Sequence, residues 1–253
     1  MDKKIKTRAP AIDRCVLILE YLQSHGASSI SEISKATGIP LSSMYVITDA
    51  MREHELIRID DNGHLHLWMK LISLGNTASE RMDIRDLVKP ALIALMDATE
   101  CLAVHYGIMY GDEAYYAVKL ERPGCGMTIR SREGMSVSLV HAGLGKCLLA
   151  YQDDETRQRL IRQLDFAKAT PTSIGTADDL VKELALIRLR GWAFDNSEGE
   201  SGIRCVACPV FDRSKRLVGA VSIVGTVTEF SDDKIPSIVE LAKRCVESIT
   251  QHL

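Results

Sequence analysis

The sequence has few aromatic residues and no long apolar run. Phenylalanine, tyrosine and tryptophan make up 5% of the 253 residues, yet the apolar total is 46%, so aliphatic side chains can fill one large or two modest domains. No segment approaches the ~20 consecutive apolar residues that a membrane-spanning helix needs. The basic start, MDKKIKTRAP, is followed by no apolar stretch of a secretory signal. We therefore expect a soluble, cytoplasmic protein without a membrane partner.

The sequence also lacks a disulfide or metal-binding pattern. Its seven cysteines are scattered and odd in number, which argues against a disulfide framework. Cys205 and Cys208 form a C-x-x-C, but residues three apart on a strand point to opposite faces, and no second pair completes a tetrahedral zinc site. We expect neither a metal nor a cofactor. A nucleophilic Cys205 or Cys147 beside His141 stays open, although buried, inert cysteines are commoner.

Positive and negative side chains are nearly balanced in number. The formal net charge is −3, and residues 1–75 contain nine Lys and Arg against nine Asp and Glu. Affinity for nucleic acid would therefore have to come from the arrangement of cations, such as those in a flexible basic arm at residues 1–10, and from helix N-termini that face phosphates.

What is present is a run of local signals between residues 29 and 68. Ser29 followed by Glu32 predicts a capping box at the start of a helix. Gly38 is typical of the left-handed residue that ends such a helix. Ile39-Pro40 then interrupts the helix, because the residue before a proline is pushed out of helical geometry. The pattern predicts two short helices joined by a tight turn.

The second helix starts near Leu41, with Met44 and Met51 on its inner side. After it the apolar period changes to two, and Asn62-Gly63 offers a two-residue hairpin turn. Two helices followed by a hairpin make a winged helix-turn-helix, which chiefly places one helix in the major groove of DNA, although some bind protein. The groove-facing candidates are Ser42, Ser43, Tyr45, Thr48 and Arg52.

The remaining two thirds of the chain alternates helices with hairpin-forming strands. This order predicts an α+β domain whose sheet is mainly antiparallel. Gly143 and Gly145 lie in HAGLGKCLLAY and run straight into a helix, where they let the chain turn and expose N–H groups that favour an anion. On spacing alone, a plain glycine turn is the commoner explanation of so short a motif.

The order of motifs resembles the IclR family of bacterial transcriptional regulators. A winged helix is followed by SLG, then HAGLGKCLLA, then GWAFDNSEGESGIRCVACPVFD, then VGAVSIVG. The resemblance implies a DNA-binding domain over residues 11–69, a linker or dimerisation helix over 70–87, and a GAF-like effector-binding domain over 88–253. It also implies a homodimer, possibly a dimer of dimers, on double-stranded operator DNA.

The resemblance further implies an effector pocket. By matching position it comprises the backbone of Gly143 and Leu144 with Asp195, Cys205 and Ser222. Two departures make this pocket more apolar than is usual: Val224 replaces a second serine, and Leu144 replaces a small residue. In the recognition helix, Val46 stands where the family commonly has arginine.

The resemblance thus implies a ligand-responsive DNA-binding regulator and no enzyme. We expect a repressor of a catabolic operon whose effector is a small organic or sugar acid. Two alternatives stay open. One is a small-molecule sensor that signals through protein contacts with little specific DNA binding, and the other is a thiol-dependent hydrolase that uses Cys205.

Overall fold

The computed structural model describes residues 7–80, 83–124 and 129–253. The chain divides into two compact units, Met1–Met82 and Asp83–Leu253, each with its own core. No helix within the described residues is both long enough and apolar enough to cross a membrane.

The division between the units falls inside the segment predicted as a linker. Of the expected basic arm, residues 1–6 lie outside the described residues. Thr7 is bound to the first helix, because its N–H and its hydroxyl both donate to the carboxylate of Asp13 at 2.8 and 2.7 Å.

The first unit is a winged helix-turn-helix. Its helices are α1 (Pro10–His25), α2 (Ile30–Thr37) and α3 (Leu41–Glu53), and its strands are β1 (Ser28–Ser29), β2 (Ile57–Ile59) and β3 (His64–Leu67) in the order β1-β3-β2. The predicted capping box is confirmed, since Ser29 Oγ accepts from the Glu32 N–H and the Glu32 carboxylate accepts from the Ser29 N–H. Gly38 is left-handed, with φ 73° and ψ 15°. These signals set the turn between α2 and α3.

Apolar residues from all three helices and the wing form the core of this unit. They are Ile18, Leu22, Ile33, Ile39, Met44, Met51, Ile57 and Leu65. The next helix, α4 (Met69–Glu80), is fixed at its start by two backbone bonds, from the N–H of Trp68 to the carbonyl of Leu56 and from the N–H of Lys70 to the carbonyl of Glu55. Along α4, Ile72 and Leu74 are exposed.

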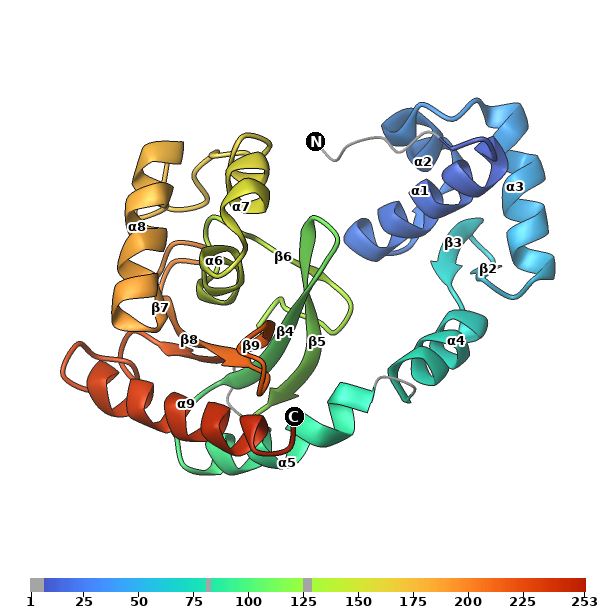
Figure 1. The fold of residues 1–253 in the computed structure, drawn as a ribbon. Helices are drawn as coiled ribbons and strands as arrows, with labels where there is room; N and C mark the ends of the chain where they lie inside the picture. The colour runs from blue at the N-terminus through green and yellow to red at the C-terminus, as the bar shows by residue number, and fades with distance from the viewer. Residues whose placement is uncertain (1–6, 81–82, 125–128) are drawn as a thin grey trace. The chain divides into compact units, whose positions relative to one another are not determined.

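The second unit is built on one six-stranded antiparallel sheet, which confirms the α+β prediction (Figure 1). Its strand order is β6-β5-β4-β9-β8-β7. The strands are β4 (Ala103–Tyr110), β5 (Glu113–Glu121), β6 (Ser136–Val137), β7 (Ala193–Asn196), β8 (Ile203–Phe211) and β9 (Leu217–Thr226).

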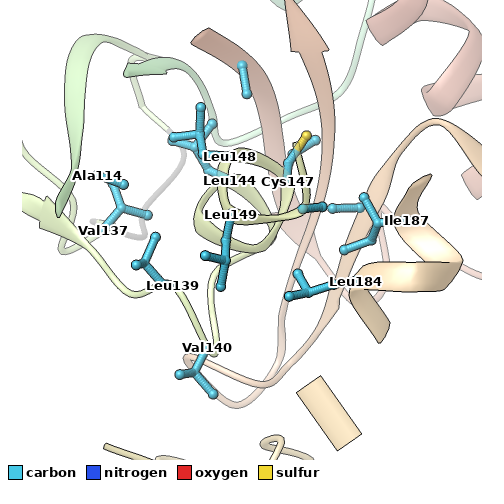
Figure 2. Packing of buried hydrophobic residues seen from close by; sticks show 14 of the residues in the cluster. Ala114, Val137, Leu139, Val140, Leu144, Cys147, Leu148, Leu149, Leu184 and Ile187 are labelled. Atoms are coloured by element: carbon cyan, nitrogen blue, oxygen red, sulfur yellow. The ribbon is translucent and has the colours of Figure 1, made fainter. Parts of the chain in front are cut away.

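Helices cover both faces of this sheet. On one face lie α5 (Asp83–Asp97) and α9 (Ile235–Thr250). On the other face α6 (Gly143–Ala150) packs on the strands, with α8 (Ala177–Arg190) against it and α7 (Asp154–Ile161) nearby. Apolar side chains of α6, among them Leu144 and Leu148, form the centre of the core on that face (Figure 2). Because both faces are covered, the central strands are buried almost throughout.

Candidate functional site

Helix α3 presents three of its five predicted groove-facing residues to solvent. Ser42, Tyr45 and Arg52 are exposed, whereas Ser43 is half-buried and its hydroxyl accepts a hydrogen bond from Arg14 Nη1 at 3.3 Å. This bond joins α3 to α1. Arg14 therefore contributes to the surface beside α3, which the sequence pattern did not indicate.

The prediction that Thr48 faces a DNA groove is wrong. Thr48 is 2% exposed, and its hydroxyl donates to the carbonyl of Met44 within the same helix at 2.8 Å. Met44, Thr48 and Met51 have the i, i+4, i+7 spacing of a core stripe, so Thr48 belongs to the buried face.

The exposed cation of α3 is already paired. Arg52 Nη2 lies 2.5 Å from Asp49 Oδ1 and 3.4 Å from Glu53 Oε1. On the wing, the guanidinium of Arg58 stacks over the ring of Trp68 at 4.7 Å. Asp60 accepts from the backbone of the hairpin and bonds to His66, which lowers the pKa of its carboxyl to about 2. The wing thus has an ordered tip and a cation held on an aromatic face.

In the second unit, the two glycines of α6 permit close packing and not a sharp turn. Neither Gly143 nor Gly145 has a positive φ. A Cβ at Gly145 would lie 2.1 Å from the carbonyl oxygen of Ser138, so only glycine fits there. A Cβ at Gly143 would lie 3.2 Å from Cys205 Sγ and 3.4 Å from the backbone nitrogen of Asp195. The start of α6 therefore touches both β7 and β8.

The predicted effector residues come together at this point. Asp195 and Cys205 are direct partners in the β7–β8 ladder, and the backbone N–H of Leu144 is hydrogen-bonded to the Cys205 thiol. Ser222, on the neighbouring strand β9, is hydrogen-bonded to the same thiol. All of these side chains are buried, and α6 has no side-chain cap at its N-terminus. The arrangement places an uncapped helix start beside a carboxyl, a thiol and a hydroxyl.

The row of polar side chains continues across the sheet beyond the predicted residues. His105 on β4 is the direct ladder partner of Ser222, and its Nδ1 is hydrogen-bonded to the Ser222 hydroxyl at 3.3 Å. Its Nε2 is hydrogen-bonded to the Ser131 hydroxyl at 2.8 Å, and its ring lies 4.8 Å from the ring of Tyr116. Burial lowers the pKa of His105 to about 3, so its imidazole is neutral at physiological pH.

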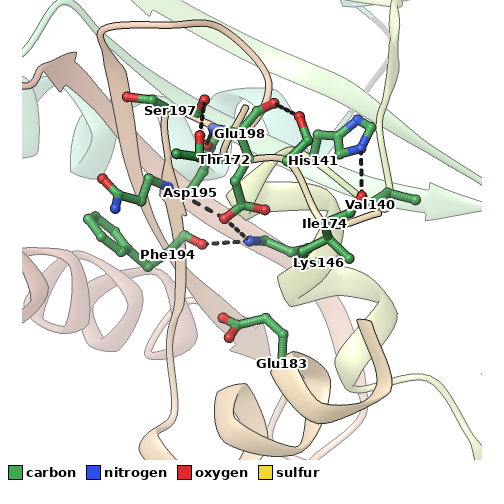
Figure 3. Close-up of polar contacts among 12 residues, drawn as sticks. Val140, His141, Lys146, Thr172, Ile174, Glu183, Phe194, Asp195, Ser197 and Glu198 are labelled. Atoms are coloured by element: carbon green, nitrogen blue, oxygen red, sulfur yellow. Dashed lines mark hydrogen bonds and ion pairs between the residues drawn. The ribbon is translucent and has the colours of Figure 1, made fainter. Parts of the chain in front are cut away.

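A buried ion pair lies behind Asp195. Lys146, on α6, is fully buried, and its Nζ donates to the carbonyl of Phe194 at 2.7 Å and to Glu198 Oε1 at 2.5 Å (Figure 3). The N–H of Glu198 donates to Asp195 Oδ1 at 2.7 Å, while Glu198 Oε2 is buried without a hydrogen-bond partner in the described residues. Lys146 therefore ties α6 to strand β7, which carries Asp195, and to Glu198 just after that strand.

Burial dominates the electrostatics of this site. It raises the pKa of Asp195 to about 7, and the negative charge of Glu198 acts in the same direction. It also raises the pKa of the Cys205 thiol to about 12, with Asp195 adding to the shift, so the thiol is not ionised and is a poor nucleophile. Cys205 faces α6 and Cys208 lies toward Lys243 of α9, on opposite faces of β8 as expected.

Two family models match the chain. The model of the IclR helix-turn-helix domain matches residues 11–61, and that of the bacterial transcriptional regulator IclR C-terminal domain matches residues 76–251. Together they extend over both structural units.

Individual proteins match over nearly the whole length. The chain is 36% identical to the uncharacterized HTH-type transcriptional regulator RhmR of Escherichia coli, over 98% of this chain and 94% of that protein. It is 28% identical to the HTH-type transcriptional repressor AllR of the same species, over 97% and 90%. The crystal structure of the Thermotoga maritima IclR matches with a TM-score of 0.75 at 29% identity, over 97% and 99% of the two chains.

Proposed function

The chain belongs to the IclR family of bacterial transcriptional regulators, and from this premise we propose that it is a cytoplasmic, ligand-responsive repressor of a catabolic operon. It is a helix-turn-helix DNA-binding regulator with an effector-binding C-terminal domain, and the family is not one of enzymes. The similarity to a protein named a repressor supports the sign of regulation. The effector we propose is a small organic or sugar acid.

One observation carries the choice of effector: the uncapped start of α6 adjoins the buried row of Asp195, Cys205 and Ser222. The N–H groups of a helix start favour a carboxylate without a cation, and here the Leu144 N–H has only the weakly accepting Cys205 thiol as its side-chain partner. Asp195, with a pKa of about 7, takes up a proton readily and can then donate to the ligand without repelling its charge. The hydroxyl of Ser222, which His105 holds in place, can both donate and accept, which suits a hydroxylated acid.

The linker helix supplies the proposed contact between two copies. Ile72 and Leu74 of α4 are each more than half exposed, as is Ile12 of α1. A second copy of the chain that covers these residues would account for their exposure. Effector binding would then change operator affinity by favouring one of two arrangements of the paired DNA-binding units.

The test is a ligand screen on the full-length protein. We expect one or more aldonic or 2-oxo acids to raise the melting temperature of the wild type, because a ligand bound only to the folded state stabilises it. Asp195→Asn should weaken this rise, while Asp97→Asn, at an exposed helix end, should leave it unchanged. A screen in which no carboxylate shifts the wild type, or in which Asp195→Asn responds like Asp97→Asn, contradicts the proposed pocket.

A further inference from the structure

Helix α3 bears an apolar patch on its exposed side. The patch consists of Leu41, Tyr45 and Val46, whose exposed fractions are 48%, 60% and 71%. Leu41 and Tyr45 are four residues apart and therefore neighbours on the helix surface. Val46 lies about 100° further around the helix from Tyr45, also exposed to solvent. We call these three residues the α3 patch. Several large apolar side chains exposed on one helix favour a surface that binds a partner molecule.

The charges around the α3 patch do not suit contacts with phosphates. Arg52 is the single cation in the sequence of α3, and it is engaged by Asp49 and Glu53. Asp49 lies four residues after Tyr45 and carries the opposite charge to the one a phosphate attracts. The affinity of this helix for DNA must therefore come largely from contacts with base edges and not with the backbone.

The only apolar group that a base pair presents in the major groove is the C5-methyl of thymine. A helix-turn-helix inserts its second helix into that groove with the N-terminal part toward the bases, and the α3 patch lies within the first six residues of α3. We infer that the α3 patch reads thymine methyl groups, with Val46, its most exposed member, as the main contact. The operator half-site then contains thymine at the positions that this patch covers.

The inference rests on the operator binding of the proposed function, and a protein occupant is the rival. A second copy of this chain already has apolar surface available elsewhere in the unit, at Ile12, Ile72 and Leu74. The exposed Ser42, next to Leu41, is also suited to base edges, because a hydroxyl both donates and accepts. These observations favour DNA.

The experiment removes the methyl group from the DNA and the side chain from the protein in turn. Full-length protein selects duplexes from a random thymine-containing pool, and the enriched duplex is then synthesised with thymine and with uracil, which lacks the methyl. We expect the wild type to bind the uracil duplex more weakly, by roughly three- to fivefold for each methyl group buried. Val46→Ala should bind the thymine duplex more weakly and should bind the two duplexes alike, which shows that side chain and methyl are coupled.

Val181→Ala is the matched control, since Val181 is an exposed valine on helix α8 of the other unit. It should bind both duplexes as the wild type does. Equal wild-type affinity for the thymine and uracil duplexes overturns the thymine inference while specific DNA binding stands. Selection of no duplex over random DNA overturns both proposals. If Val46→Ala keeps its DNA affinity but sediments as a smaller species, the α3 patch belongs to a protein contact and the inference fails.

Discussion

The two units of this chain depart from the usual distribution of side chains in opposite directions. The first unit leaves large apolar residues in water, such as Val46 and Ile72. The second encloses charged and polar residues, such as Lys146, Asp195 and His105. Each departure costs stability unless a partner or a hydrogen bond compensates it. An exposed apolar surface suits a macromolecule that covers it, whereas an enclosed polar row suits a small ligand.

The largest effect on this contrast between the units is expected from removing the buried cation of the second unit. Lys146→Ala should lower the free energy of unfolding of that unit by about 3–5 kcal/mol, because it leaves the buried charge of Glu198 without a partner. The double variant Lys146→Met/Glu198→Leu should recover much of this loss. The free energies of unfolding of the single and the double variant are measured by denaturant unfolding. The fluorescence of Trp192, the tryptophan of the second unit, reports the transition.

Lys182→Ala is the control for this experiment. Lys182 pairs with Asp179 at 3.1 Å on the surface, where an ion pair contributes little, so no measurable change is expected. If Lys146→Ala and Lys182→Ala unfold at the same denaturant concentration, the buried pair of Lys146 and Glu198 does not stabilise the second unit.

The next effect comes from the glycines of α6. Gly145→Ala should destabilise the second unit by about 3 kcal/mol or more, because its Cβ would meet the carbonyl oxygen of Ser138 at 2.1 Å and the backbone must move. Gly143→Ala should fold but lose effector affinity, since its Cβ fits tightly against Cys205 and fills the start of the helix. Thermal melting without ligand measures the loss of stability, and the shift in melting temperature on adding ligand measures the loss of effector affinity.

Gly175→Ala serves as the reference, because its Cβ would meet only the flexible end of the Lys168 side chain. Near wild-type stability is expected for it. A Gly145→Ala protein as stable as Gly175→Ala would contradict the close contact between α6 and residue 138.

A smaller effect is the pH dependence that Asp195 gives to the second unit. Its pKa is about 7 when folded and near 3.8 when unfolded, so between these values the folded state holds a proton that the unfolded state has lost. The folded state is therefore favoured at the acid end of this window, and stability falls as pH rises through it, by up to about 1.4 kcal/mol per pH unit. Asp195→Asn removes this contribution.

The neighbours of Asp195 carry charge as well. Glu198 and Lys146 face it, and burial raises the pKa of Glu198 too. Denaturant unfolding of the wild type and of Asp195→Asn from about pH 5 to about pH 7 isolates the part due to Asp195. Identical slopes in the two proteins would mean that Asp195 is already ionised in this range.

The smallest effect expected is that of Thr48→Val in the first unit. The hydroxyl bonds only within its own helix, so its loss should change the free energy of unfolding by less than about 1 kcal/mol and leave DNA affinity unaltered. Fluorescence of Trp68 follows the stability, and anisotropy of a labelled duplex follows the binding. A marked loss of DNA affinity would contradict the assignment of Thr48 to the buried face and would support a contact with DNA.

Local signals made the first unit largely predictable from sequence. The capping box of Ser29 and Glu32, the left-handed Gly38 and a hairpin at Asn62-Gly63 each depend on a few adjacent residues, and all three are found. The two-residue turn predicted for this hairpin is wrong, because Asp60 and His64 close the loop and leave residues 61–63 between them, with a positive φ at Gly63 and not at Asn62. Thr48 was misjudged because its polar identity outweighed its spacing from Met44 and Met51. A threonine whose hydroxyl bonds to the carbonyl four residues earlier can occupy a core position at little cost.

The second unit was less predictable because its contacts join distant segments. His105 meets Ser222 across 117 positions of sequence, and Lys146 meets Glu198 across 52. Strand alternation also failed to single out His105, since helices cover both faces of the sheet and β4 is buried on either side. The pairing of Asp195 with Cys205 was foreseen only through the resemblance to a family, not through spacing.

The central position of β9 has a consequence for synthesis. Strand β9 pairs with β4 on one side and β8 on the other, so the sheet stays in two pieces until residues 217–226 have been translated. The winged helix, complete by residue 67, can fold on the ribosome long before this. In a nascent chain the winged helix-turn-helix can therefore fold before the effector-binding unit is complete. Until β9 is made, the unpaired edge of β4 is exposed and is a site where a chaperone would prevent wrong strand pairing.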